Sequence, residues 1–272
     1  MSAIPQEPIA QGRTAEIYPW TDGKVLKLFR DGSPVKGAVK ESRLVRLVRE
    51  AGLQVANVDG LVEVDGRVGL VYEYHEGRSL LHAMVARPWS ILWGALLFAD
   101  LQIGLHSCVV EGMPAQRQRL ENRIDDAGIL PRETRDALIQ ALRDLPDGDR
   151  LCHGDFHPDN VLLDADGPTI IDWADATRGN PWADVAQTTV LLDVSPAPEG
   201  TPRVWLVNMF RGLFQAIYRR RYVSLRPIGR ASLSAWRPLV AAARLADCPP
   251  AEREGLLAIV ETSRPVRNGR AS

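Results

Sequence analysis

Cysteine is scarce in this sequence, and its distribution excludes two classes of small stabilised protein. The three cysteines, Cys108, Cys152 and Cys248, stand far apart, and no two of them form a Cys-x-x-Cys pair. Neither a disulfide framework nor a zinc knuckle is indicated, because both need paired or closely spaced cysteines. A reducing compartment fits this pattern, and we expect a cytoplasmic protein.

Long hydrophobic runs and an excess of charge are missing as well. The longest uncharged stretch, Pro88 to Ala99, is too short to cross about 30 Å of hydrocarbon, and no basic segment followed by an apolar one opens the chain. The formal net charge is −1, which argues against binding to nucleic acid by bulk electrostatics. We therefore expect neither a membrane nor a nucleic-acid partner, and the sequence leaves the oligomeric state open.

The residues that are present have the composition of a globular protein. The 272 residues are 45% hydrophobic and 25% charged, so the chain is long enough to form one large domain or two lobes around a sizeable core. The charge is unevenly spread, because residues 201–272 hold 13 arginines and four acids, a net +9, whereas the first 200 residues sum to −10. The C-terminal quarter is therefore distinctly basic.

The first 76 residues are typical of a small antiparallel sheet with one inserted helix. Four β-type runs are joined in pairs through Asp22-Gly23 and Asp65-Gly66, two dipeptides that favour type I′ hairpin turns. Between the pairs, Ser33-Pro34 is a suitable helix start, and a helical stripe of apolar residues runs on to Gly52. We expect a hairpin, a helix and a second hairpin in this order.

Beyond residue 77 the apolar periodicity becomes helical, with one strand-loop-hairpin interruption at 151–173. We place a lobe boundary at 74–78, which gives an N-terminal lobe of residues 1–76 and a C-terminal lobe of residues 77–272. Four tryptophans in the helical part are expected in its core: Trp89, Trp93, Trp205 and Trp236. Helices are expected at 79–84, 89–108, 115–127, 132–145, 185–192, 202–222 and 233–246.

The most informative stretch is LCHGDFHPDNVLLDADGPTIIDWADA, residues 151–176. If 161–163 pairs with 169–171 around a turn at 164–168, Asn160 falls opposite Asp172. Directly opposed residues have Cβ atoms about 4.5 to 5.5 Å apart, so the amide and the carboxylate could share one hard cation such as Mg²⁺. Asp155 would then be a free carboxylate near the metal, suited to act as base for a hydroxyl nucleophile.

These motifs resemble the catalytic loop and metal-binding segment of the aminoglycoside phosphotransferase and choline kinase-like family, distant relatives of protein kinases. His-Gly-Asp, His-Pro, the Asn and the later IDWADA stand at the family's spacing, and RGNPWADVA continues the pattern. By this resemblance Asp155 is the catalytic base, Asn160 and Asp172 bind Mg²⁺, and the residues that brace the loop are His153, His157 and Asp184.

The resemblance also implies a nucleotide-binding N-terminal lobe. Lys27 corresponds to the lysine that holds the α- and β-phosphates of ATP, and Glu41 to its partner on the helix. A loop with a single glycine, Gly12, would cover the phosphates, and the segment 71–75 corresponds to the hinge whose backbone meets adenine. The residues expected to bind ATP are therefore Gly12, Arg13, Thr14, Lys27, Glu41, Glu73 and Tyr74.

Two departures narrow the substrate. Only 11 residues separate Asp172 from Asp184, and no Ala-Pro-Glu sequence follows, so a protein-kinase activation segment has no room. Gly154 replaces the arginine of the protein-kinase His-Arg-Asp motif. A small-molecule hydroxyl is therefore the expected acceptor, and the basic C-terminal quarter favours a neutral or anionic one over a polycationic aminoglycoside. Against this, the acids Asp175 and Asp193 could line the acceptor pocket.

The expected fold is α+β and two-lobed, protein kinase-like, with an antiparallel-sheet N-lobe and a mainly helical C-lobe. The expected function is transfer of the ATP γ-phosphoryl group to a small-molecule hydroxyl with Mg²⁺. Two alternatives stay open. The glycine-poor loop would suit a pseudokinase that binds nucleotide without turnover, and the spacing of His153, Asp155 and His157 would suit a metal-dependent hydrolase.

Overall fold

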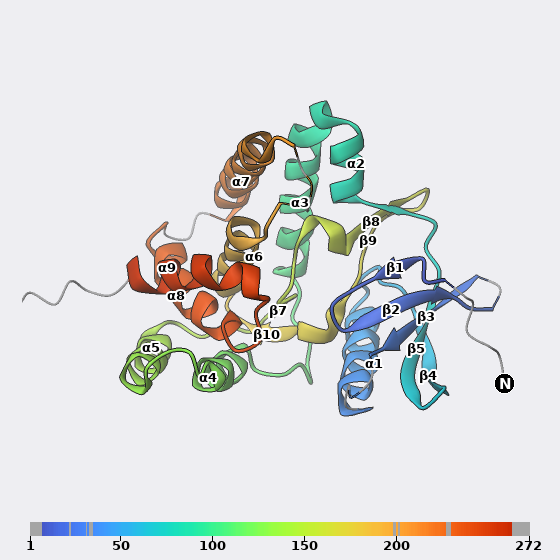
Figure 1. Cartoon of the computed structure of the whole chain (residues 1–272), viewed down its shortest axis with the longest axis horizontal. Coiled ribbons are helices and arrows are strands. Elements are labelled where there is room, and N and C mark those ends of the chain that lie inside the picture. Colours follow the sequence, from blue (N-terminus) through green and yellow to red (C-terminus); the bar gives the residue numbers. More distant parts are fainter. Residues whose placement is uncertain are drawn as a thin grey trace, which may run out of the picture. The chain divides into compact units, whose positions relative to one another are not determined.

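The computed structural model describes residues 7–21, 23–30, 32, 35–197, 200, 202–226 and 230–262 (Figure 1). The chain forms two compact units, each built from several segments. The first comprises Met1–Val85, Val110–Met113 and Pro158–Ala176, and the second comprises Ala86–Val109, Pro114–His157 and Thr177–Ser272.

This division differs from the expected single boundary between residues 76 and 77. The short strand β6 (Arg78–Ser79) follows that boundary, yet it pairs with β8 (Val161–Asp164) of the hairpin that we had assigned to the C-terminal lobe. At Gly77 an added Cβ would lie 2.9 Å from the Leu163 carbonyl oxygen, so the two backbones are in close contact. The hairpin therefore belongs to the first unit, with the N-terminal sheet.

The first unit contains the expected antiparallel sheet, which has five strands in the order β1-β2-β3-β5-β4. Asp65 and Gly66 both have positive φ, 52° and 76°, which confirms a type I′ turn. The earlier hairpin has a longer connection, because the Trp20 amide donates to the Lys24 carbonyl and three residues lie between them; Asp22 is outside the described residues. The strands are β1 (Ala10–Gln11), β2 (Ala15–Pro19), β3 (Lys24–Phe29), β4 (Val58–Val64) and β5 (Arg67–Glu73).

Strand alternation gives this sheet two different faces. Leu26 and Leu28 of β3 are fully buried on one face, in a cluster with Tyr18, Val64 and Val71. Intervening residues of β3 point to the other face, where helix α1 (Val35–Glu50) packs. Its expected start at Ser33 and Pro34 lies outside the described residues. The alternation therefore places Lys27 on the helix-covered face.

The hairpin of β8 and β9 (Gly167–Ile170) has a different register from the one expected. Asp164 pairs with Gly167, and Val161 pairs with Ile170, so Asn160 stands opposite Ile171, whose amide donates to its carbonyl at 3.0 Å. The expected pairing of Asn160 with Asp172 is wrong by one residue. The Asp164 carboxylate accepts the Asp166 amide, and this local bond closes a tighter turn than the one we assumed.

The second unit is mainly helical, as expected. Its strands β7 (Arg150–Cys152) and β10 (Thr177–Gly179) pair with each other. Every helix expected from the periodicity is present, and α9 adds one that was not expected. Helix α2 (Leu80–Ala86) ends where the second unit begins. The α-helices that follow are α3 (Ile91–Leu105), α4 (Gln116–Asp126), α5 (Arg132–Asp144), α6 (Pro181–Val194), α7 (Val204–Leu225), α8 (Arg230–Arg244) and α9 (Arg253–Thr262).

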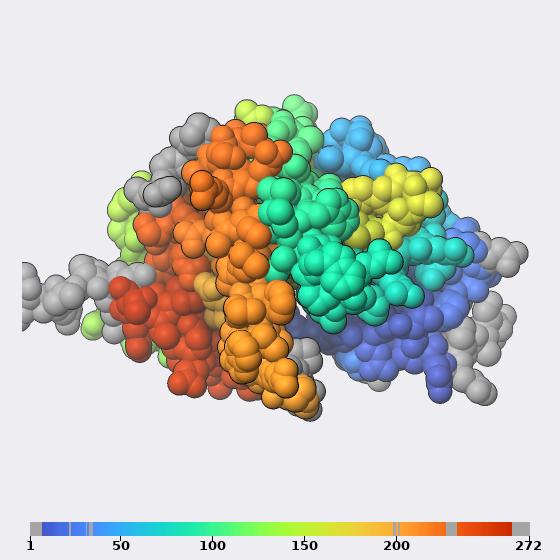
Figure 2. Space-filling model, turned by 90° about the horizontal axis from the view of Figure 1, so that it is seen from above, coloured from blue at the N-terminus to red at the C-terminus, as the bar shows by residue number. Residues whose placement is uncertain are grey.

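The tryptophans correct another expectation. Trp236 is buried, but Trp89, Trp93 and Trp205 have exposed fractions of 80%, 51% and 63%. Helices α3 and α7 meet through their other faces, where Phe98 contacts Tyr218 with ring centroids 5.3 Å apart. In the space-filling view the orange atoms of α7 run along the surface beside the teal-green atoms of α3 (Figure 2). Helical periodicity alone does not tell which face of each helix is covered.

One described segment, Pro88–Leu105, is long and apolar enough to cross a membrane by length and composition. It extends past Ala99, where we ended the uncharged stretch, because it tolerates the single charge of Asp100. In the structure this charge is paired with Arg221 at 2.8 Å, and Gln102 donates to the buried carboxylate of Asp184. The segment is thus a packed helix of the second unit, held by polar as well as apolar contacts.

Candidate active site

Lys27 is the centre of a charged cluster inside the first unit. Its Nζ lies 2.7 Å from Glu41 Oε1 on α1 and 3.0 Å from Asp172 Oδ1, just after β9. The Lys27 side chain is 12% exposed and that of Glu41 is 2% exposed. Burial alone would lower the pKa of Lys27, but the carboxylates of Asp172 and Glu41 raise it well above its usual value, so the ammonium stays charged.

Tyr72 is a member of this cluster that the sequence analysis missed. Its hydroxyl donates to Glu41 Oε1 at 2.6 Å, so one carboxylate oxygen accepts from both Lys27 and Tyr72. Burial, followed by the charge of Glu41, raises the pKa of Tyr72 and keeps this donor protonated. A signal existed in the sequence, because antiparallel pairing places Tyr72 opposite Val25 and therefore diagonal to Lys27 on the same face.

Asp172 reaches Lys27 from a strained backbone position. Its φ of 64° places it in the left-handed region, which costs a non-glycine residue about 1 to 3 kcal/mol and concentrates at functional sites. Strand β9 has ended two residues earlier, so the alternation of the ladder no longer sets the direction of this side chain. Asn160 is buried in the short turn Pro158–Asn160 that precedes β8. Both belong to the first unit.

The other residues expected to contact the nucleotide lie at two places on the same sheet, the connection between β1 and β2 and the end of β5. Gly12, Arg13 and Thr14 form the tight connection between β1 and β2, where the Gly12 amide donates to the Ala15 carbonyl at 2.8 Å. An added Cβ at Gly12 would lie 3.3 Å from that carbonyl oxygen, which favours glycine there. Arg30 also ties this loop, since its guanidinium donates to the Gly12 carbonyl and its amide to that of Thr14.

Glu73 and Tyr74 end strand β5, and their amides are engaged within the chain. The Glu73 amide donates to the Asn57 carbonyl and the Tyr74 amide donates to the Gly23 carbonyl, both at 2.9 Å. An adenine ring would therefore have to meet their carbonyl oxygens or the residues that follow. Their part in nucleotide binding stays a prediction.

Asp155 stands in a loop of the second unit between two histidines. Its carboxylate lies 3.6 Å from His157 Nε2, and its amide donates to Nδ1 of the buried His153 at 3.3 Å. Burial pushes the pKa of Asp155 upward, but the hydrogen bond and charge of His157, with smaller contributions from His153 and Arg244, lower it to about 2. The carboxylate is therefore ionised at neutral pH, as a proton acceptor must be.

Asp184 supports this loop from helix α6. Its Oδ1 accepts the Gly154 amide at 2.7 Å and its Oδ2 accepts the His153 amide at 3.3 Å, so it holds the two peptide groups before Asp155. Burial raises the pKa of Asp184, but hydrogen bonding to His106 and the Gly154 amide leaves it below its ordinary value. The carboxylate is thus the fixed point on which the backbone of the loop rests.

The phosphotransferase enzyme family matches residues 6–223 of the sequence, well over half of the chain. This chain belongs to that family. The matched range contains every residue that the sequence analysis singled out for the site, from Gly12 to Asp184. The expected relationship to aminoglycoside phosphotransferases and choline kinases is confirmed, and with it the enzyme class of a small-molecule kinase.

Solved structures of similar fold support the protein kinase-like architecture of this phosphotransferase. An aminoglycoside-3′-phosphotransferase of type VIII is 22% identical with a TM-score of 0.62, covering 89% of this chain and 93% of its own. An amicoumacin kinase in complex with AMP-PNP, Ca²⁺ and Ami is 16% identical with a TM-score of 0.60, covering 95% and 88%. A choline/ethanolamine kinase family protein from Mesorhizobium loti is 20% identical with a TM-score of 0.58, covering 95% and 87%. No curated protein sequence matches significantly.

The site geometry does not favour the alternative function, a metal-dependent hydrolase. Among the described residues, no group of three or more His, Cys, Asp and Glu side chains is placed to hold a metal ion. Nδ1 of His153 is occupied by the Asp155 amide, which removes one expected ligand atom. Asp172 and Asn160 instead offer the carboxylate and carboxamide oxygens that Mg²⁺ prefers.

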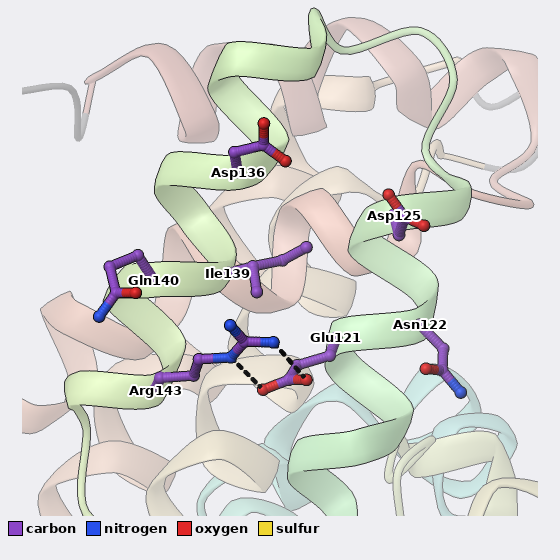
Figure 3. A pocket seen from close by; sticks show the side chains of 7 residues that line it. All are labelled: Glu121, Asn122, Asp125, Asp136, Ile139, Gln140 and Arg143. Atoms are coloured by element: carbon purple, nitrogen blue, oxygen red, sulfur yellow. Dashed lines mark hydrogen bonds and ion pairs between the residues drawn. The ribbon is translucent and has the colours of Figure 1, made fainter.

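One hollow on the second unit lies away from these residues, in a groove of about 470 Å³ between α4 and α5 (Figure 3). None of the expected site residues lines it. Arg143 reaches across the groove from α5 and forms two hydrogen bonds with Glu121 of α4, at 3.0 and 3.3 Å. The two side chains neutralise each other's charge, and we assign this groove no part in the reaction. Its lining residues are Glu121, Asn122, Asp125, Asp136, Ile139, Gln140 and Arg143.

Proposed function

We propose that this phosphotransferase transfers the γ-phosphoryl group of ATP to a hydroxyl of a small molecule, in a reaction that depends on Mg²⁺. The observation that carries the proposal is the position of Lys27, buried and ion-paired at once with Glu41 and Asp172. Burying a lysine with two carboxylates costs free energy, because all three charges lose water. A role in phosphate binding accounts for this arrangement, because a fixed cation can stabilise the charge on the phosphates.

The residues of the first unit are proposed to bind the nucleotide. Lys27 would donate to the phosphates while Glu41, supported by Tyr72, keeps its ammonium in place. Gly12, Arg13 and Thr14 would cover the phosphates, and Glu73 and Tyr74 would flank adenine. Asn160 and Asp172 would hold Mg²⁺, which when bound neutralises negative charge on the transferring phosphoryl group.

Asp155 is proposed to orient the acceptor hydroxyl and take its proton. The low pKa of this carboxylate, with burial opposed chiefly by His157, means that it accepts a proton only as the hydroxyl oxygen bonds to phosphorus and becomes strongly acidic. Its role would be mainly positioning, which suits a loose transition state for phosphoryl transfer.

We also propose that the acceptor is neutral or anionic, because two acids of the second unit, Asp193 and Glu252, are already paired with arginines. Asp193, once a possible pocket acid, accepts from Arg237 at 2.7 Å and also from Gln215. Arg244 forms two hydrogen bonds with Glu252, at 2.6 and 3.0 Å. The carboxylates of Asp193 and Glu252 are therefore already neutralised by arginine and are not open to the ammonium groups of a substrate. Arg244 is itself one of the cations that act on Asp155.

The test is a panel of acceptors assayed by coupled ADP release with Mg-ATP. Sugars, nucleosides and hydroxy acids are expected to support turnover, and kanamycin-like aminoglycosides are expected to fail. Efficient phosphorylation of an aminoglycoside would overturn the acceptor class but not the kinase. Nucleotide binding without turnover on any acceptor would instead support the pseudokinase, and tightly held zinc would support the hydrolase.

Two variants test the roles of the site residues in the same assay. Asp155→Asn keeps the size of the side chain but removes the proton acceptor, so turnover should fall by about 10²-fold or more while ATP binding is retained. Asp172→Ala should abolish the Mg²⁺-dependent part of nucleotide binding. Turnover that survives Asp155→Asn, or Mg²⁺-stimulated binding that survives Asp172→Ala, would refute the corresponding assignment. The three cysteines are free, in keeping with the proposed cytoplasmic location.

A further inference from the structure

Three helices of the second unit bring two arginines to one carboxylate, that of Asp193 near the end of α6. Asp193 Oδ2 lies 2.7 Å from the guanidinium of Arg237 on α8, and Asp193 Oδ1 accepts from the side-chain amide of Gln215 on α7, also at 2.7 Å. A second nitrogen of Arg237 donates to Thr189 Oγ1 at 2.9 Å. Both oxygens of Asp193 are therefore engaged, and Arg237 balances its charge.

Arg211 is the second arginine of this cluster. It stands one turn before Gln215 on α7, on the same face of the helix, and its charge interacts with that of Asp193. The residue is partly buried. Among the described residues, none forms a hydrogen bond or an ion pair with its guanidinium. Two arginines therefore share one carboxylate, which leaves a net positive charge in the cluster.

Helix α7 provides no partner for Arg211. Its 22 residues, 204–225, include four arginines and no acid, so no carboxylate stands one turn away on the same face. The helix surface beside Arg211 is also open, because a Cβ added at Gly212 would have no other side chain or loop within 4 Å. A ligand therefore has access to Arg211 along α7.

The charge of Arg211 is less well compensated than that of a paired arginine in the same unit. Burial lowers the pKa of Arg211, and the opposing effect of Asp193 does not restore it. Burial also lowers the pKa of Arg244, but there the hydrogen bonds and charge of Glu252 outweigh burial and raise the pKa above its ordinary value. A partly desolvated cation without an acceptor of its own costs free energy, and a bound anion would offset that cost.

Two helices connect this cluster to the loop that carries Asp155. On α6, Thr188 donates to the carbonyl of the residue after Asp155 at 3.0 Å, and Asp193 follows five residues later. On α8, Arg244 acts on the charge of Asp155, and Arg237 precedes Arg244 by seven residues. At a rise of 1.5 Å per residue, these separations are about 7 and 10 Å. An acceptor of metabolite size that places its hydroxyl at the base therefore reaches the cluster with its other end.

We propose that Arg211 binds an anionic group of the acceptor, a carboxylate or a phosphate, and that Arg237 assists by neutralising Asp193, which would otherwise repel that anion. The inference rests on the proposed function and narrows its neutral or anionic acceptor to an anionic one. The planar guanidinium of Arg211 suits either group, because it donates two parallel hydrogen bonds to a pair of oxygens. Arg211 is thereby a residue that determines substrate specificity.

The kinetic arm uses pairs of acceptors that differ in charge: a hydroxy acid with its carboxamide, and a sugar phosphate with its parent sugar. Wild type should prefer the anionic member of one pair, which tells whether carboxylate or phosphate is bound. Arg211→Gln should lower kcat/KM for that anion by about 10-fold or more, mainly by raising KM, and change the neutral member by less than about twofold. Arg211→Lys keeps the charge without the planar fork and should lie between.

Arg220→Gln is the matched control, because it removes the same charge from an exposed position of the same helix. Both members of each pair should then change by less than about threefold. Equal losses for the anion in Arg211→Gln and Arg220→Gln would show a general field instead of a site and would overturn the proposal. A wild type that phosphorylates neutral acceptors and no anionic one would also overturn it, while leaving the proposed function intact.

The second arm does not need activity. In ¹⁵N spectra of the arginine side chains, the Nε–H signal of Arg211 is identified by its loss in Arg211→Lys, and that of Arg220 by its loss in Arg220→Gln. Inorganic phosphate and acetate are then titrated separately into wild type, and the Arg211 signal should shift to saturation with at least one of them while the Arg220 signal does not. If this result holds in a protein without kinase activity, the proposed function fails and the anion site stands. An Arg211 signal that does not move, or that moves in parallel with Arg220, would overturn the inference.

Discussion

At the scale of single residues, the Glu41 carboxylate shows how a buried charge is kept in place. One of its oxygens accepts from both Lys27 and Tyr72, so the lysine balances the charge and the tyrosine satisfies a lone pair that water cannot reach. Removing one donor from a buried charged group costs more than the average hydrogen bond, because the other charge remains desolvated.

Tyr72→Phe tests this arrangement. We expect a loss of about 2 kcal/mol in the free energy of unfolding and a severalfold higher KM for ATP, because Glu41 then holds Lys27 less firmly. Tyr18→Phe is the matched control on the same sheet, since its hydroxyl donates to Glu16 at 3.1 Å and Glu16 keeps Arg67 as a partner. Thermal unfolding and ATP kinetics of both variants provide the measurement, and equal behaviour of the two would contradict the role of Tyr72.

The pH dependence of the proposed base, Asp155, gives a second prediction. Burial is the largest single effect on Asp155 and raises its pKa, but the hydrogen bond and charge of His157, together with His153 and Arg244, outweigh it and lower the pKa to about 2. The carboxylate therefore stays charged down to that pH. His157→Gln removes the largest lowering influence, and the pKa of Asp155 should rise toward its ordinary value of 3.8.

The acid limb of kcat/KM should therefore move to higher pH in His157→Gln, by about one pH unit or more. Samples returned to neutral pH before a second assay separate this reversible effect from acid unfolding. Identical acid limbs in wild type and variant would show that His157 does not act on Asp155.

The sequence predicted some site residues and could not have predicted others. Lys27 stands between two leucines that alternate to the opposite face, a pattern that favours an enclosed lysine, and the family resemblance indicates Glu41 as its partner; in the structure the two are 2.7 Å apart. His106 gave no comparable signal. Its partners, Asp184 and Tyr222, are 78 and 116 residues away, and only the packing of α3 against α6 and α7 brings them together.

At the scale of secondary-structure elements, helix α6 connects the stability of the fold to the loop that it supports. Asn180 caps its N-terminus by accepting the Trp182 amide at 2.9 Å, and the amide group of the same side chain donates to the Pro146 carbonyl at 3.1 Å. Asp184 follows one turn later. The cap therefore fixes the end of the helix that carries the loop's carboxylate.

Asn180→Ala should remove both bonds and destabilise the protein by about 1 to 2 kcal/mol, which corresponds to a fall of about 2 to 8 °C in the melting temperature. Asn122→Ala is the control, because Asn122 is on helix α4 and its side chain accepts from exposed Gln118. Calorimetry of the two variants provides the measurement. A melting temperature of Asn180→Ala equal to that of the control would rule out the cap as a source of stability.

The two hairpins show what turn signals can and cannot predict. Asp65-Gly66 has the residues that a type I′ turn requires, and its register follows directly. The β8–β9 turn places Ala165 and Asp166 at its tip, a pair with no comparable preference, while the neighbouring Gly167-Pro168 suggested a longer loop. Its register is set by the hydrogen bond from the Asp166 amide to Asp164 and by pairing with β6, whose residues are 83 and 85 positions from their partners in the sequence.

At the scale of the whole molecule, the uneven charge of the sequence is the property most relevant to substrate choice. Residues 201–272 carry +9 and the others −10, and arginines from this basic region pair with acids from elsewhere, as Arg237 does with Asp193 and Arg221 with Asp100. These two pairs neutralise only two of the 13 arginines of this region, so a net positive charge remains. The resulting field should attract anionic metabolites and repel polycations.

An ionic-strength series tests this field. For an anionic acceptor, kcat/KM should fall severalfold between about 10 and 300 mM salt, because the Debye length shortens from about 30 Å to under 8 Å over this range. A neutral sugar or nucleoside in the same buffers should show little change. A fall of the same size for the neutral acceptor would assign the effect to the protein or to ATP rather than to steering of the acceptor.

The positions of the tryptophans give the molecule a built-in optical reporter. Trp173 directly follows Asp172, is buried, and donates its indole hydrogen to the Ile170 carbonyl. The exposed Trp89, Trp93 and Trp205 emit from water, where iodide can quench them. The blue-shifted emission that survives quenching then comes from buried indoles, which include Trp182 and Trp236 as well as Trp173. The part of this emission that Trp173→Phe removes would follow the segment next to Asp172 on addition of Mg-nucleotide, without any attached dye.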